Sequence, residues 1–213
     1  MPGEAQTVLG NMEEVTHLTA CGKKVYRGKL CGKETAVIVT DAGKVNAACG
    51  AQYAVDVLGA DRIINIGVAG GLNDGTTVGE IYGISAVVQY DFDLVQLNGT
   101  PMGTLNEFEE PYLPLDTTPL YPLKNLGTGD RFNDSKRDFE LLTGKLKADI
   151  RDMECGAIAQ ACAHAGVQCY SFKCISDVAG SDSTTEQYLA NLELCYKNLT
   201  AAMPTIFEGV NNG

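Results

Sequence analysis

The chain has 213 residues, a length typical of one domain. Hydrophobic residues make up 45% of it and charged residues 20%, so a sizeable core can form, which excludes a disordered chain, a collagen-like repeat and a coiled coil. The net charge of −11 would repel nucleic-acid phosphates and anionic lipid headgroups, so we expect neither nucleic acid nor a membrane as a partner.

We expect no targeting segment and no metal site from the sequence. No apolar run approaches the ~18–20 residues that span a bilayer, and the first residues do not combine a basic region with an apolar one, as a signal peptide does. We therefore expect a cytoplasmic protein. The eight cysteines form no CxxC pair, and no cysteines and histidines have the spacing of a zinc site. We expect free, mostly buried thiols and no bound metal.

Strand and helix patterns alternate along the chain. In chain order, strands are expected over residues 7–9, 24–30, 34–40, 62–67, 80–90, 123–127, 150–153 and 167–175. Helices are expected over residues 43–58, 135–142 and 154–165, and from about Thr184 onward. Residues 97–130 lack periodicity and hold five of the seven prolines, which is typical of a functional or interaction surface. The alternation predicts one α/β sandwich with a central mixed sheet over residues 1–213.

Acidic residues follow three of the predicted strands. They are Glu13-Glu14, Glu154 and Asp177, and ligands of open α/β sheets bind beyond such strand ends. The small-residue loop 68–72 lies at another strand end, where backbone amides can approach a ligand closely. Each feature also has a purely structural interpretation as a turn or a helix cap. From these residues alone, we predict only an α/β enzyme with an acidic site.

Six short segments carry a resemblance to a known family. They are 8–15 (VLGNMEEV), 41–45 (DAGKV), 64–72 (INIGVAGGL), 129–132 (GDRF), 152–159 (DMECGAIA) and 175–177 (ISD). Together and in this order they resemble the methylthioadenosine/S-adenosylhomocysteine nucleosidases of the nucleoside phosphorylase superfamily. The resemblance covers nearly the whole chain and implies a single-domain, three-layer α/β/α sandwich of the nucleoside phosphorylase type.

The resemblance also implies an activity. It is hydrolysis of the N-glycosidic bond of 5′-thio-substituted adenosines, which releases adenine, by a cytoplasmic homodimer that needs no metal or organic cofactor. Glu14 would deprotonate the attacking water, with Glu13 as an alternative one residue away. Asp177 would donate a proton toward N7 of the purine, and Ser176 would orient Asp177.

The substrate-binding residues follow from the same resemblance. Glu154 would accept hydrogen bonds from the ribose hydroxyls above Met153, Phe132 would stack on the base, and Lys173 would lie near the sugar and the water. The implied substrate-binding set is Glu154, Met153, Phe132, Ser176, Val68, Ala69, Gly70 and Lys173.

Several positions depart from the nucleosidase pattern. Val68 and Lys173 replace a serine and an arginine, and the region 97–125 is shorter. These changes leave open another 5′ substituent or a degenerate, nucleoside-binding relative. Asn65 stands where phosphorylases of the superfamily carry a phosphate-binding arginine, which favours water over phosphate as the nucleophile. Phosphorolysis remains the alternative, with Arg27 of a neighbouring subunit as a possible phosphate ligand.

Overall fold

Two β-sheets organise the part of the chain that the computed structural model describes, residues 1–132, 134–180 and 183–212. The smaller sheet is antiparallel, in the order β1-β2-β3. Its strands are β1 (Met12–Ala20), β2 (Lys23–Leu30) and β3 (Lys33–Val39). The larger sheet is mixed, in the order β6-β5-β7-β8-β4-β9, and β9 also pairs with β5, so its ends approach each other. Its strands are β4 (Arg62–Gly71), β5 (Ile81–Gln89), β6 (Leu113–Pro114), β7 (Leu123–Thr128), β8 (Ile150–Asp152) and β9 (Gln168–Val178).

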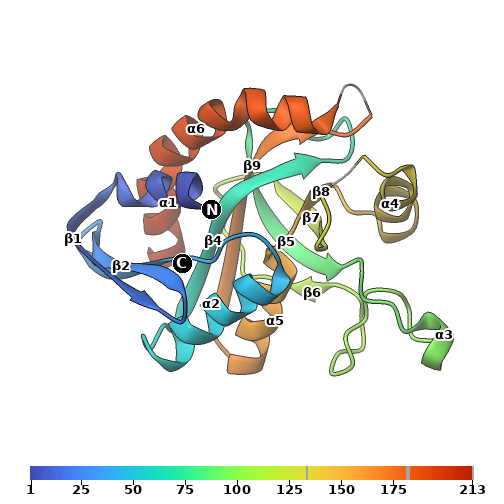
Figure 1. Cartoon of the computed structure of the whole chain (residues 1–213), viewed down its shortest axis with the longest axis horizontal. Helices are drawn as coiled ribbons and strands as arrows, with labels where there is room; N and C mark the ends of the chain where they lie inside the picture. Colours follow the sequence, from blue (N-terminus) through green and yellow to red (C-terminus); the bar gives the residue numbers. More distant parts are fainter. Residues whose placement is uncertain (133, 181–182, 213) are drawn as a thin grey trace.

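Helices cover both faces of the larger sheet (Figure 1). The helices are α1 (Pro2–Leu9), α2 (Lys44–Asp56), α3 (Val95–Asn98), α4 (Lys136–Glu140), the π-helical segment η1 (Leu141–Leu146), α5 (Cys155–Ala165) and α6 (Thr184–Asn212). Apolar side chains of α6 such as Met203 and Phe207 pack with Tyr170 and Phe172 of β9 on one face. The other face carries α2 and α5 over a second buried cluster. The predicted three-layer sandwich with a mixed sheet is therefore confirmed.

Most predicted elements are confirmed within one to three residues at each end. The hairpin of β2 and β3, helix α2 and strands β5, β7 and β8 lie where the pattern places them. Ser135 caps α4 by accepting a hydrogen bond from Asp138 N, as expected, and the helical path continues through η1. All eight cysteines are free thiols, and five of them are buried, as expected.

Two predictions at the strand level are wrong. Residues 7–9 are the last turn of α1, because Pro2 occupies the first helical turn, Glu4 lies in that turn, and the helix runs on from there. The loop predicted at 68–72 is mostly strand, because β4 continues through Gly71 alongside β9. Region 97–130 is largely irregular, as predicted, apart from the end of α3, β6 and β7.

Strand β4 has one open edge. Among the described strands, residues Arg62 to Ala69 pair only with β9, and β8 joins the opposite edge only at Gly70 and Gly71. A cavity borders that open edge, with β3 on its other side.

None of the helices in the described ranges is long and apolar enough to cross a membrane.

Candidate active site

A cavity of about 960 Å³ lies where the glycine-rich end of β4, the end of β9 and the first turns of α1 and α5 meet. The predicted substrate-binding residues all line it, together with Asp177: Val68, Ala69, Gly70, Phe132, Met153, Glu154, Lys173 and Ser176. This is the edge at which ligands of α/β sheets bind, beyond the carboxyl ends of parallel strands.

Asp177 reaches the cavity through an irregularity in the β4–β9 ladder. Ala69 pairs with Ile175 but Gly70 pairs with Asp177, so Ser176 is an extra residue on β9. Such a bulge re-aims the side chain that follows it. Ser176 Oγ donates to Asp177 Oδ1 at 2.7 Å, and the buried Oδ2 has no hydrogen-bond partner among the described residues. Burial raises the pKa of Asp177, which favours the protonated, proton-donating form.

Glu154 lies at the N-terminal boundary of α5, two residues after the end of β8. Its Oε1 accepts a hydrogen bond from Gly43 N at 2.9 Å, so the starts of α2 and α5 are tied together. Burial and the nearby Asp152 raise the pKa of Glu154 to about 7, although Lys173 opposes this shift. The carboxyl is thus a hydrogen-bonding group on the cavity wall whose charge changes near neutral pH.

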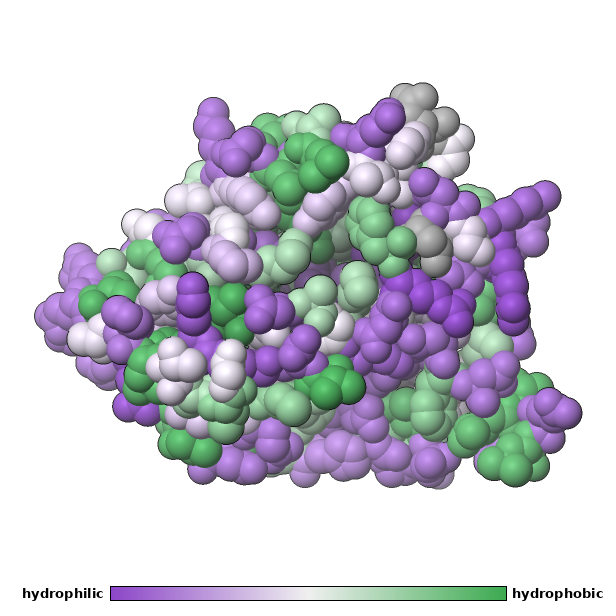
Figure 2. Space-filling view, viewed as in Figure 1, coloured by the Kyte–Doolittle hydropathy of each residue, from purple (hydrophilic) through white to green (hydrophobic). Residues whose placement is uncertain are grey.

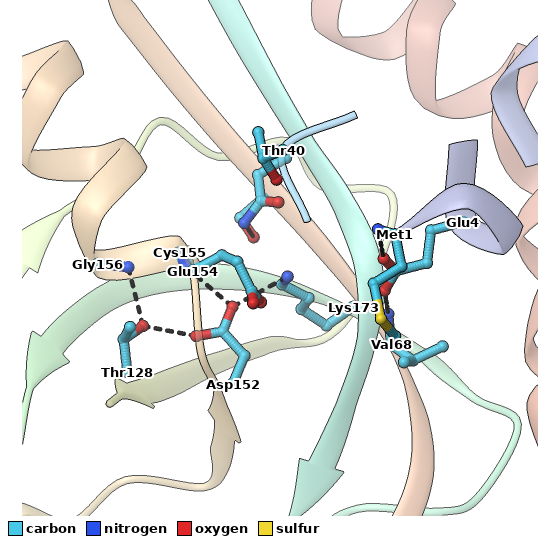
Figure 3. A network of polar contacts seen from close by, with 12 residues as sticks. Met1, Glu4, Thr40, Val68, Thr128, Asp152, Glu154, Cys155, Gly156 and Lys173 are labelled. Carbon is cyan, nitrogen blue, oxygen red and sulfur yellow. Dashed lines mark hydrogen bonds and ion pairs between the residues drawn. The ribbon is translucent and has the colours of Figure 1, made fainter. Parts of the chain in front are cut away.

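The buried ammonium group of Lys173 lies beside the carboxyl groups of Asp152 and Glu154 (Figure 3). Lys173 Nζ lies 3.0 Å from Asp152 Oδ2, and both side chains are 2% exposed. Asp152 also accepts from Thr128 Oγ1 at 2.6 Å and from Cys155 N at 3.0 Å. Burial alone would lower the pKa of Lys173, but the surrounding anionic groups, Asp152 above all, raise it, so the lysine stays charged. Removing the cation from this cluster would leave buried anions without a counter-charge.

The structure places Glu4, rather than Glu14, in this cavity. Glu4 Oε1 accepts a hydrogen bond at 2.9 Å from Val68 N, on the open edge of β4. Glu14 lies on β1, where its exposed carboxylate pairs with Lys29 Nζ at 2.7 Å. The reason is that residues 12–20 form a strand of the outer antiparallel sheet, and Glu13 is exposed there too. Of the residues described, neither Glu13 nor Glu14 lines the cavity.

Sequence reasoning missed Glu4, although a signal for it was present. Pro2 is at a favoured position for a helix start, and an acidic residue in the first helical turn suits the helix dipole. The interpretation of residues 7–9 as a strand directed attention to the acidic residues that follow it, Glu13 and Glu14, and away from Glu4 in the first turn of α1. The contacts of Thr128 and Asp152 around Lys173 could not be predicted from any local sequence pattern, because Thr128 and Asp152 are 24 residues apart in the sequence.

The aromatic wall of the cavity is partly open. Phe132 is 49% exposed and makes an edge contact with Tyr188, with ring centroids 5.3 Å apart. Both rings line the cavity, as does Met153 beside Glu154. Asn65, the residue in the position of a phosphate-binding arginine, is buried and donates to Ser171 Oγ at 3.3 Å.

Comparisons with known proteins place this geometry in context. The family model described as "Phosphorylase superfamily" matches residues 1–208. A 5′-methylthioadenosine/S-adenosylhomocysteine nucleosidase of Geobacillus thermodenitrificans is 27% identical, over 98% of this chain and 94% of its own. A Helicobacter pylori nucleosidase of the same name, solved in complex with a substituted pyrrolidin-3-ol, superposes with a TM-score of 0.89 at 20% identity, over 98% of this chain and 94% of its own. The futalosine hydrolase of Helicobacter pylori superposes equally well, with a TM-score of 0.89 at 21% identity and the same coverage.

Proposed function

Because the chain belongs to the phosphorylase superfamily, we propose that it hydrolyses the N-glycosidic bond of 5′-thio-substituted adenosines such as methylthioadenosine and S-adenosylhomocysteine, and releases adenine. The observation that carries this proposal is that Glu4, Glu154 and Asp177, from three separate elements, line one cavity. The curated relatives that carry the nucleosidase name support the choice of substrate.

The proposed mechanism assigns one step to each carboxyl group. Glu4, in place of Glu14, takes a proton from water, whose oxygen bonds to C1′ of the ribose. The C1′–N9 bond breaks, and its electron pair goes to the purine while Asp177 donates its proton to N7. Glu154 holds the ribose hydroxyls, and Met153 packs under the sugar. The proton gained by Glu4 and the one lost by Asp177 re-equilibrate with solvent, so one water is consumed in each cycle.

The charges of the cavity suit this reaction. Breaking a glycosidic bond builds positive charge on the ribose, and preorganised carboxylates stabilise that charge. The departing purine carries negative charge, which a proton from Asp177 neutralises; such general acid help is worth roughly 10²–10⁴-fold in rate. The aromatic ring of Phe132 would stack on the base at the open side of the cavity.

Water is favoured over phosphate as the nucleophile. Phosphate binding would need fixed positive charge beside the sugar, and Asn65 contributes none. Among the arginines that line the cavity, Arg131 pairs with Asp138 and Arg151 lies beside Asp177. Arg27, the alternative phosphate ligand, is exposed on β2 and lies outside the residues described as lining the cavity. Lys173 is already paired with Asp152.

Product analysis on a nucleoside panel tests the proposal. The purified protein is incubated with methylthioadenosine, S-adenosylhomocysteine and adenosine, with and without inorganic phosphate. Free ribose derivatives and adenine at equal rates in both conditions are the expected result. Ribose 1-phosphate products that depend on phosphate would make the protein a phosphorylase. Tight adenine binding without turnover of any nucleoside would make it a degenerate binding protein.

We further propose that the protein is a cytoplasmic homodimer that acts in purine and methionine salvage, as the family resemblance implies. The exposed apolar residues of the α3 region support a contact surface, since Leu97 is 79% exposed and Val95 41%. Figure 2 shows hydrophobic side chains gathered at the corner where α3 projects. Sedimentation at twice the 22.6 kDa chain mass is the expected result, and a monomer at micromolar concentration would contradict it.

A further inference from the structure

Two of the segments singled out in the sequence, 41–45 (DAGKV) and 129–132 (GDRF), meet at the start of α2. Asp130 Oδ1 accepts a hydrogen bond at 2.8 Å from the backbone N of Lys44, the first residue of α2. Asp130 and residues 42–46 also line a second, smaller cavity of about 300 Å³, together with Met153. The two segments therefore adjoin the start of α5, yet the mechanism proposed above gives Asp130 no role.

Asp130 supplies a cap that α2 lacks locally. The N-cap residue of α2 is Gly43, which has no side chain to accept from the first N–H groups of the helix. Asp130, 86 residues away in the sequence, accepts from one of them, and a carboxylate there suits the positive end of the helix dipole. The backbone N of Asp130 donates to Asp91 Oδ2 at 3.0 Å. Lys44 Nζ lies 2.5 Å from Asp91 Oδ1, so Asp91 anchors both partners of the cap.

Gly43 connects this cap to the ribose-binding carboxyl. Its backbone N donates to Glu154 Oε1 at 2.9 Å. The φ of Gly43 is +100°, which glycine adopts readily and other residues rarely. A Cβ on Gly43 would lie 3.2 Å from Asp130 Oδ1. The position of the Asp130 carboxylate therefore limits where Gly43, and the N–H that it directs at Glu154, can lie.

We propose that Asp130 is a positioning residue, which acts through Gly43 to hold the Glu154 carboxyl in the orientation that accepts the ribose hydroxyls. The inference rests on the proposed hydrolysis, in which Glu154 binds the ribose. Asp130 itself is not among the described residues that line the main cavity. Because Asp130 is exposed, solvent screens its charge, and its contribution is an acceptor at a fixed place. Displacing a binding group by about 1 Å can cost on the order of 10²-fold in rate.

The first test compares a riboside with its 2′-deoxy counterpart. kcat/KM is measured for 5′-methylthioadenosine and for 2′-deoxy-5′-methylthioadenosine, and the first value is divided by the second. Asp130→Ala should lower this ratio by about 5–10-fold, part of the ~10–100-fold that a hydrogen bond to a charged group contributes. Asp130→Asn keeps an acceptor oxygen and should retain at least about half of the wild-type ratio. A lower ratio in Asp130→Asn, or an unchanged ratio in Asp130→Ala, overturns the inference.

The second test asks whether Asp130 acts through Glu154. Calorimetry gives the Kd of the same two nucleosides in proteins that all carry Asp177→Asn, so that turnover does not interfere. Asp130→Ala should weaken the preference for the riboside when Glu154 is present and change it by less than about two-fold in a Glu154→Ala background. An equal loss in both backgrounds overturns the inference.

The binding test also separates this inference from the proposed hydrolysis. If the wild-type chain turns over neither nucleoside, the hydrolysis proposal fails, and the Kd ratios still decide the role of Asp130. A chain that binds neither nucleoside overturns both.

A purely structural role for Asp130 predicts a different result. If its carboxylate only caps α2, Asp130→Ala lowers the melting temperature and slows both substrates alike, and the constant ratio overturns the inference. Asp93→Ala is the matched control, because Asp93 Oδ1 accepts from Val95 N at 2.9 Å at the start of α3, away from the residues described as lining the cavity. Its ratio should equal that of the wild type, and a fall as large as in Asp130→Ala overturns the inference. If Asp130→Ala does not fold, Lys44→Met, which releases Asp91 from the cap, is measured with the same criterion.

Discussion

Glu4 and Glu14 form a matched pair for testing which carboxylate activates the water. Glu4→Gln removes the proposed base from the cavity and should lower turnover by at least ~10²-fold while substrate binding survives. Glu14→Gln removes only an exposed ion pair with Lys29, a contact worth about 0.2–1 kcal/mol of stability, and should leave turnover unchanged. Steady-state kinetics on methylthioadenosine decide between them. Loss of turnover in the Glu14 variant alone would instead identify Glu14, on β1, as the base that activates water.

Asp177 is tested by the leaving group of the substrate. Asparagine keeps the shape of the side chain but cannot transfer a proton, so Asp177→Asn should abolish most turnover of adenine nucleosides. The loss should be much smaller for a nitrophenyl riboside, whose leaving group departs without protonation. A melting curve run in parallel reports folding. If turnover of both substrates falls equally, Asp177 stabilises the turn after β9 and does not donate a proton.

Glu154 gives a stability prediction that depends on pH. Its pKa in the folded state is about 7, against an ordinary value of 4.5, because of burial and Asp152. The folded state therefore holds this proton more tightly than the unfolded state, so this group lowers the free energy of unfolding as pH rises from about 4.5 to about 7. Glu154→Gln cannot ionise. Chemical denaturation should show the variant gaining stability relative to wild type between pH 5 and pH 8, and a constant or shrinking difference would contradict the assignment.

At the scale of elements, the bulge in β9 and the glycine opposite it determine where the acid lies. A Cβ on Gly70 would lie 2.8 Å from Asp177 Oδ2, so Gly70→Ala should displace the carboxyl and lower kcat by about ten-fold or more with a small change in melting temperature. Gly144→Ala is the matched control, since a Cβ there meets none of the described atoms within 4 Å. Equal kinetics in the two variants would show that the close approach at Gly70 is unimportant.

The elements also show what could be predicted from the sequence. Helix α5 has apolar residues at helical spacing and ends at Gly166 in the left-handed conformation, and β9 is a continuous apolar run, so local patterns predicted both. The predicted site residues at the start of α5 and on β9 lie together at the cavity. Helix α1 is short and its apolar residues resemble a strand, so Glu4 was missed and Glu14 was chosen. The bulge at Ser176 arises from pairing between distant strands, which no local pattern contains.

At the scale of the whole molecule, the excess of acidic residues controls the response to salt. The chain has a net charge of −11 over 213 residues, so its excess carboxylates repel one another in the folded state. Raising NaCl from 10 mM to 150 mM shortens the screening length from roughly 30 Å to about 8 Å and should raise the melting temperature. Choline chloride at the same ionic strength should act alike, because the effect is screening. A melting temperature that falls with both salts would contradict this view.

The cluster around Lys173 has a consequence for how activity is acquired during folding. Its charges come from Glu4 near the start of the sequence, from Asp152 and Glu154, and from Lys173 on β9. Glu4 accepts a hydrogen bond from Val68 of β4 that spans 64 residues. Contacts between such distant residues require the closure of long loops, which is slow compared with the formation of helices. In refolding from denaturant, the helical signal should therefore recover first and catalytic turnover last, when α1 docks against β4. A fragment that begins after residue 9 would lack Glu4, the proposed base, however well the remaining sheet assembled.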